Sequence, residues 1–172
     1  DFRDLADQVT TRVWRYLTMT GFDADGLDLH LQRCWPVLSE WGQVVGRHHH
    51  PNAHLSAVLY LSGDGSGVDG PLCLHAPQQL NELVPGLAVG HGGPITHDHP
   101  CNQPEWMLSS EPGLLVLFPS RLHHSVAANE TEDALRVSVS FDFVLTARAA
   151  DRPSEYMSPH PHQWQRCKRP VP

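Results

Sequence analysis

The histidines that could do chemistry in this chain lie in two short segments. The chain holds 13 histidines in 172 residues, and three of them, His48, His49 and His50, directly precede Pro51. Pro51 favours an extended backbone at His50. Two histidines separated by one residue place both rings on one side of an extended strand. His48 and His50 therefore predict part of a metal site, which a third histidine from a distant strand would complete.

The third ligand is expected in the segment 118–124, which ends on two adjacent histidines, His123 and His124. Zinc and non-haem iron both use imidazole ligands, and non-haem iron is commonly held by two histidines and one carboxylate. The chain contains no His-x-Asp or His-x-Glu sequence. The second ligand is therefore His50, which gives a three-histidine site, or a carboxylate from elsewhere, such as Asp98.

Two further His-x-His pairs occur outside these segments. His97 and His99 lie in a proline-rich stretch, and His160 and His162 lie in a segment with little periodicity. Loops hold the geometry of metal ligands less firmly than strands do. These two pairs are the weaker candidates for a metal site.

An arginine opens the strand pattern that follows His124. Arg136, Ser138, Ser140 and Asp142 alternate with apolar residues, so they share one face of a strand. An arginine can hold a carboxylate through charge-assisted hydrogen bonds. Arg136 is therefore a candidate for binding an acidic ligand close to the metal.

The elements that must position these residues are mostly strands. Apolar residues at helical spacing predict a helix over 2–18 with Gly21 as its stop. Alternation over 55–61 and 136–143, and the apolar run 114–118, predict β-strands. Short strands with Gly and Pro turns and one leading helix indicate a mainly β fold. We expect a double-stranded β-helix, a cupin-like jelly roll with the N-terminal helix packed on one sheet.

The length of the chain predicts a single domain over 1–172. Its expected parts are a helix within 1–20, a β core over 31–145 and a surface tail over 146–172. Residues 76–112 are rich in proline and glycine and predict a long loop inside the core. Long loops in compact domains often act as lids or binding loops, so Trp106 and Met107 are candidate substrate contacts.

Composition excludes several classes of function. Hydrophobic residues make up 40% of the chain and charged residues 18%, as in globular proteins. The formal charge of −7 argues against a nucleic-acid partner, and no stretch approaches the roughly 18 apolar residues of a membrane helix. The four cysteines show no Cys-x-x-Cys spacing and no secretory signal pattern opens the chain. We therefore expect a cytoplasmic protein with reduced thiols.

Five short motifs occur in order between about residues 31 and 145. They are Trp35-Pro-Val, His48-x-His50-Pro51-Asn52, Leu55-Ser-Ala-Val-Leu-Tyr60-Leu, Phe118-Pro-Ser-Arg-Leu-His-His124 and Arg136-Val-Ser-Val-Ser-Phe141. Together they resemble a family of 2-oxoglutarate/Fe(II)-dependent oxygenases. The resemblance implies a double-stranded β-helix with Fe(II) at its mouth and 2-oxoglutarate as cosubstrate.

The resemblance also implies roles for single residues. His48 and His124 match the two iron histidines of the superfamily, and His50 stands where the wider superfamily has Asp or Glu. Arg136 matches the basic residue that pairs with the distal carboxylate of 2-oxoglutarate. The cosubstrate-binding residues that we expect are Arg136, Ser138 on the same strand face, and Tyr60.

These observations predict a non-haem Fe(II)- and 2-oxoglutarate-dependent oxygenase. Its substrate is expected to be a small molecule, or an amino-acid or protein side chain, that it hydroxylates, with no catalytic groups beyond the metal ligands. Two alternatives stay open: a cupin-like three-histidine metalloenzyme that uses no 2-oxoglutarate, and a non-catalytic β-sandwich module that binds a metal. No nucleic-acid or membrane partner is expected, and the edge strands of such folds leave a homodimer open.

Overall fold

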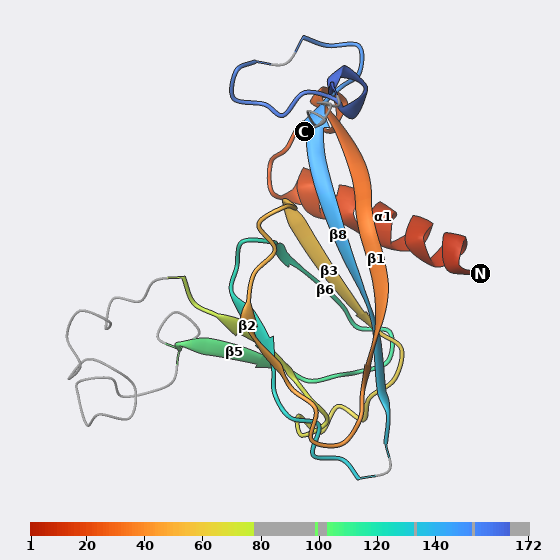
Figure 1. The fold of residues 1–172 in the computed structure, drawn as a ribbon, viewed down its shortest axis with the longest axis vertical. Coiled ribbons are helices and arrows are strands. Elements are labelled where there is room, and N and C mark those ends of the chain that lie inside the picture. Colours follow the sequence, from red (N-terminus) through yellow and green to blue (C-terminus); the bar gives the residue numbers. More distant parts are fainter. Residues whose placement is uncertain (78–98, 100–102, 133, 153, 166–172) are drawn as a thin grey trace, which may run out of the picture.

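Two four-stranded antiparallel sheets face each other, and a long helix lies across the outside of one of them (Figure 1). The structure is a computed structural model that describes residues 1–77, 99, 103–132, 134–152 and 154–165. The first sheet has the order β1 (Leu27–Ser39), β8 (Arg136–Ala147), β3 (Leu55–Tyr60) and β6 (Leu115–Pro119). The second has the order β2 (Val45–His48), β7 (His124–Val126), β4 (Leu72–His75) and β5 (Glu105–Leu108). This is the strand order of a jelly roll, and it confirms the predicted fold class.

Helix α1 (Phe2–Met19) covers the outer face of the first sheet. Its residues Val9, Val13 and Leu17 follow one another at intervals of four, so they form one stripe, and all three are buried. They pack against the outward side chains of β3 and β8, which are Leu55, Ala57, Val139, Phe141 and Phe143. The helix predicted over 2–18 and its packing on one sheet are thereby confirmed.

The end of α1 is fixed by a glycine, as its position in the sequence predicts. Gly21 has a φ of 90°, a conformation that costs glycine little and other residues more. The N–H of Gly21 donates to the carbonyl of Thr18, and the N–H of Phe22 donates to that of Leu17. This pair of bonds is a Schellman motif, which satisfies two carbonyls of the last turn.

The alternation of β3 and β8 assigns one face of each strand to the helix and the other to the interior. Tyr60 lies directly opposite Ser138, and Ser56 lies directly opposite Asp142. These four residues are on the inward face, between the two sheets, and all are buried. The polar face of the first sheet therefore lines an internal space rather than the solvent, as a jelly roll with an open mouth allows.

The structure corrects the expected extent of the long loop. Residues 76–112 were expected to lack a strand, but β5 occupies Glu105–Leu108 and pairs in register with β4. A four-residue strand is too short to show alternation, so its pairing with a neighbour decides its conformation. Trp106 and Met107 belong to this strand, whereas 78–98 and 100–102 lie outside the described residues. The expected role of this segment as a lid is therefore not tested.

The structure also moves the start of the tail. β8 continues to Ala147, two residues into the segment 146–172, because β1 extends alongside it as far as Leu27. The part of the tail that is described holds a short 3-10 helix over Pro161–Gln163. Within the described part of the chain, no helix is long and apolar enough to span a membrane.

Candidate metal centre

Three histidines from different parts of the chain meet at one end of the space between the sheets. His48 is the last residue of β2 and lies directly opposite His124, the first residue of β7. His50 follows two residues after β2. The ring centroids are 4.2 Å apart for His48 and His124, 5.0 Å for His50 and His124, and 5.2 Å for His48 and His50. One ligand atom of each lies within 4.8 Å of the other two.

Each of these rings uses Nδ1 in a hydrogen bond with an oxygen atom that can only accept. The three contacts are His48 Nδ1 to the Gly46 carbonyl at 2.8 Å, His124 Nδ1 to the Leu122 carbonyl at 2.9 Å, and His50 Nδ1 to Asp142 Oδ1 at 2.7 Å. The proton of each neutral imidazole therefore resides on Nδ1, and Nε2 keeps its lone pair. Histidines that bind metals are typically oriented in this way by a second hydrogen bond.

His50 is held by a buried carboxylate that is itself fully hydrogen-bonded. Asp142 is fully buried on β8. Its Oδ1 accepts from His50 Nδ1 and, at 2.7 Å, from Ser56 Oγ, while its Oδ2 accepts from Arg33 Nε at 2.6 Å. Burial raises the pKa of Asp142, but the bonds from Ser56, His50 and Arg33 outweigh it and hold the pKa below its ordinary value. Asp142 is therefore an anion.

Burial also keeps His124 neutral. Burial, with smaller effects from His48 and His50, lowers the pKa of His124 to about 4, against the opposing effects of the Leu122 carbonyl and Asp142. His123 lies on the other side of β7, where its ring is 4.7 Å from that of His49. Strand alternation thus separates the two adjacent histidines, and only His124 joins the cluster. Asp98 and His97, named above as further ligand candidates, lie outside the described residues.

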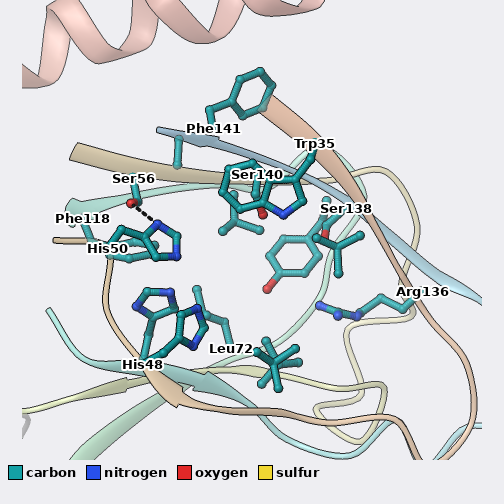
Figure 2. A pocket seen from close by; sticks show the side chains of 17 residues that line it. Trp35, His48, His50, Ser56, Leu72, Phe118, Arg136, Ser138, Ser140 and Phe141 are labelled. Atoms are coloured by element: carbon teal, nitrogen blue, oxygen red, sulfur yellow. Dashed lines mark hydrogen bonds between the residues drawn. The ribbon is translucent and has the colours of Figure 1, made fainter. Parts of the chain in front are cut away.

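A cavity of about 250 Å³ runs from the three histidines between the two sheets. Figure 2 shows His48 and His50 at one end of it and Arg136 reaching in from the opposite side. The walls between these ends carry large apolar side chains, among them Trp35, Leu72 and Phe118. Largely apolar walls of this kind strengthen the charge interactions inside a cavity.

The guanidinium group at the far end of the cavity has polar atoms with no protein partner. Arg136 is only 3% exposed, and within the described part of the chain its Nε and Nη2 make no hydrogen bond. Its Cζ lies 5.6 Å from the ring centroid of Tyr60, whose hydroxyl likewise has no hydrogen-bond partner among the described residues. Burial raises the pKa of Tyr60, although Arg136 and Ser110 oppose this, so the phenol stays protonated and can donate. Buried polar groups are rarely left unpaired, and this pair fits an anionic ligand.

Ser138 lines the same cavity and lies opposite Tyr60 in the sheet. The structure thus brings together all three residues that were predicted to bind a cosubstrate, on the side of the cavity away from the histidines. Asp142, Ser56 and Arg33 were not among the predicted site residues. The available signal was the position of Asp142 on the same strand face as Arg136 and Ser138, which was noted only as part of the alternation.

Residues 33–142 match the sequence profile of the family described as "Putative 2OG-Fe(II) oxygenase". The match spans more than half of the chain and includes all six predicted site residues. The chain belongs to this family of oxygenases. No protein with a curated description matches its sequence.

Several solved structures are similar to this chain at low sequence identity. An oxidoreductase of that family from Burkholderia pseudomallei is 16% identical with a TM-score of 0.50, and the match covers 75% of this chain and 50% of that one. A prolyl-4-hydroxylase from Pseudomonas putida is 21% identical with a TM-score of 0.48, covering 81% and 62%. HygX from Streptomyces hygroscopicus, solved with iron bound, is 17% identical with a TM-score of 0.46, covering 67% and 58%. The oxygenase chain therefore spans about half to three fifths of the length of these proteins.

Proposed function

We propose that this protein uses Fe(II) and 2-oxoglutarate to hydroxylate a small molecule or an amino-acid or protein side chain. One observation carries the proposal. Three histidines whose Nδ1 atoms are engaged by acceptor oxygens and a buried arginine with unpaired N–H groups face each other across a single cavity. A metal ion at one end and a carboxylate at the other would satisfy both sets of atoms.

His48, His50 and His124 would hold the metal. Their Nδ1 atoms are already engaged, so the rings need no change of tautomer to bind through Nε2. The low pKa of His124 means that no proton has to be displaced from it near neutral pH. The Fe(II) centre with its 2-oxo acid would supply the oxidising chemistry with O2 as the oxidant: one oxygen atom of O2 would enter the succinate formed as 2-oxoglutarate loses CO2, and the other would enter a substrate C–H bond.

Asp142 would supply the negative charge that a ligating carboxylate supplies in relatives with two histidines and one acid. Three neutral imidazoles leave the full charge of a divalent ion uncompensated. The Asp142 carboxylate accepts the Nδ1–H of His50 at 2.7 Å, which makes His50 a more electron-rich ligand. Ser56 and Arg33 keep this carboxylate ionised and in place.

Arg136, Tyr60 and Ser138 would bind the carboxylate of 2-oxoglutarate that lies away from the metal. The guanidinium offers the N–H groups of Nε and Nη2 along one edge of its plane. A carboxylate can accept from both through two parallel hydrogen bonds. The Tyr60 hydroxyl can donate a further bond. The apolar walls between these groups and the histidines exclude water from the reacting atoms.

Turnover of 2-oxoglutarate by matched histidine variants tests this function. The Fe(II)-loaded protein is expected to release labelled CO2 from 1-¹⁴C-2-oxoglutarate in the presence of oxygen, and His124→Ala is expected to abolish the release. His123→Ala, one residue away on the outer side of the strand, is the control and should retain it. Metal binding and turnover by His124→Ala at the level of the unaltered protein would contradict the assignment.

A three-histidine oxygenase that uses no 2-oxo acid is the second candidate. The observation that favours it is the set of metal ligands itself, because His50 occupies the position where a carboxylate is usual. This candidate predicts oxygen consumption that does not depend on 2-oxoglutarate and is unaffected by substitution of Arg136. It provides no ligand for the unpaired N–H groups of Arg136, so we rank it lower.

A further inference from the structure

A second cluster of potential ligands lies away from the cavity, where the C-terminal segment meets β1. Asp28 and His30 belong to β1, and His160 belongs to the segment that follows β8. One ligand atom of each lies within 4.8 Å of the other two. The rings of His30 and His160 approach edge to face, with centroids 5.1 Å apart. This cluster includes one of the His-x-His pairs, His160 and His162, that the proposed oxygenase site does not use.

We propose that Asp28, His30 and His160 bind a Zn(II) ion that fastens the C-terminal segment to β1. Two imidazoles and one carboxylate are a ligand set that zinc accepts, with water as the fourth ligand. One pair, Asp28 Oδ2 and His160 Nε2, is 3.5 Å apart, which is long for a hydrogen bond. Two ligand atoms at about 2.1 Å from a tetrahedral zinc ion are separated by about 3.4 Å.

Each of the three side chains is oriented by a second contact, as is usual for metal ligands. Thr146 Oγ1 donates to the carbonyl of Ala147, so the contact of 3.0 Å between His30 Nε2 and Thr146 Oγ1 places a proton on Nε2. Nδ1 of His30 then keeps its lone pair. Asp28 Oδ2 accepts from the backbone N–H of Ala149 at 3.0 Å.

His160 is oriented by its neighbour in the His-x-His pair. Nδ1 of His160 accepts from the backbone N–H of His162 at 3.3 Å and lies 2.6 Å from Nδ1 of His162. Its Nε2 lies 3.5 Å from Asp28 Oδ2, and a metal bound there would displace the Nε2 proton. The side chains of His160 and Asp28 are 20% and 37% exposed, which leaves an ion accessible from solvent but partly shielded by protein.

Hydrogen bonds already hold the segment that follows β8 in place. The N–H of Ala147 donates to the carbonyl of Ser158 at 2.8 Å, and Arg148 Nη1 donates to the carbonyl of Asp25 at 2.6 Å. A metal bound to β1 and to His160 would add a further attachment. Because the ion binds the folded chain and not the unfolded one, it would stabilise the fold by mass action.

The number of zinc ions that remain bound after gel filtration tests the proposal. The metal-free protein, loaded with Zn(II), is expected to retain two ions per chain. His160→Ala and Asp28→Asn should each retain one, as should His124→Ala, and the double variant with His124→Ala and His160→Ala should retain none. Tyr156→Ala, an exposed change in the same segment, is the control and should retain two.

The counts separate this proposal from the proposed oxygenase site. Loss of one ion in His124→Ala but not in His160→Ala or Asp28→Asn would overturn the second site and leave the first intact. The reverse pattern would overturn the three-histidine centre alone. Circular dichroism of each variant shows whether a lost ion reflects a lost fold. The melting temperature should rise with Zn(II) in His124→Ala, and a rise of equal size in the double variant would contradict the second site.

Discussion

At the scale of single residues, the candidate centre depends on the groups that accept hydrogen bonds from its histidines. The pair His50–Asp142 combines an imidazole ligand with a buried anion one hydrogen bond away. A site with three histidines can in this way carry a charge similar to that of a site with two histidines and a carboxylate. The partners of Asp142, namely Ser56 and Arg33, are therefore part of the proposed function and do more than stabilise the fold.

Asp142→Asn isolates the charge from the hydrogen bond. The amide oxygen can still accept from His50, but the negative charge is gone. We expect the dissociation constant for Fe(II) or Co(II) to rise about 10- to 100-fold, as for other groups that support metal ligands, measured by competition with a chelating dye.

Arg33→Met is the matched control, since it removes the guanidinium partner of Asp142 and leaves the bonds to His50 and Ser56. Its effect on metal affinity should be clearly smaller. An unchanged affinity in Asp142→Asn would show that the carboxylate does not act on the metal through His50.

Substitution of Arg136 should weaken ligand binding without lowering the stability of the ligand-free fold. Because Nε and Nη2 of Arg136 are buried without partners, the side chain does little to stabilise the ligand-free fold. Arg136→Met should weaken 2-oxoglutarate binding about 10- to 100-fold, since a hydrogen bond to a charged group is worth about 1.5–3 kcal/mol. The melting temperature of the ligand-free variant should not fall.

Calorimetric titration of the metal-loaded variant and a thermal melt measure these two quantities. Unchanged affinity for 2-oxoglutarate would remove Arg136 from the proposed site. A large loss of stability with unchanged affinity would assign it a structural role instead.

The sequence predicted the residues of the candidate centre better than the reason for their arrangement. Alternation along an extended strand was expected to align His48 and His50, but β2 ends at His48. The orientation of His50 comes from Asp142, 92 residues further along the chain. No local pattern contains that contact, because strand pairing creates it. In the same way, the sequence could not decide between His123 and His124, because the choice depends on where β7 begins and on its pairing with β2.

At the scale of elements, the long alternating segments could be predicted and the short ones could not. The helix 2–18 and the strands within 55–61 and 136–143 have clear periods and agree with the structure. β2, β4, β5 and β7 hold three or four residues each. Such strands show no period, and the neighbours with which they pair define them. The edge strand β1 was missed because its exposure follows no simple alternation.

The packing of α1 on the first sheet should determine stability without affecting metal binding. Leu17 is 1% exposed where α1 packs against the first sheet, whereas Met19 is 75% exposed. Leu17→Ala should lower the free energy of unfolding by about 2–5 kcal/mol, measured by urea denaturation, and Met19→Ala should change it by less than about 0.5 kcal/mol. Both variants should bind metal at the three-histidine centre with the affinity of the unaltered protein. A Leu17→Ala variant as stable as the Met19→Ala control would show that the helix is not part of the core.

At the scale of the whole molecule, the family match covers 33–142, while α1 and the C-terminal segment lie outside it. The helix completes the core of the first sheet, and the C-terminal segment carries the proposed zinc site. The apolar stripe of the helix predicted the first role, whereas the second could not be predicted, since it depends on contacts between the C-terminal segment and a distant strand. The expected single domain over 1–172 stays a prediction.

Metal and 2-oxoglutarate should each raise the stability of the whole molecule, in two separable steps. A ligand that binds only the folded state, present at one hundred times its dissociation constant, adds about 2.7 kcal/mol. Thermal melts should show one increment on addition of metal to the chelator-treated protein and a second on addition of 2-oxoglutarate. Arg136→Met should lose the second increment and keep the first. Equal increments in this variant and in the unaltered protein would place the 2-oxoglutarate site elsewhere.

The most direct test of the central claim is an anaerobic visible-absorption titration of the Fe(II)-loaded protein with 2-oxoglutarate. The account predicts a metal-to-ligand charge-transfer band that grows to saturation with one 2-oxoglutarate per chain. The band should require much more 2-oxoglutarate in Arg136→Met and be absent in His124→Ala. Iron bound by His48, His50 and His124 with no such band at any 2-oxoglutarate concentration would contradict the account and favour the three-histidine centre that uses no 2-oxo acid.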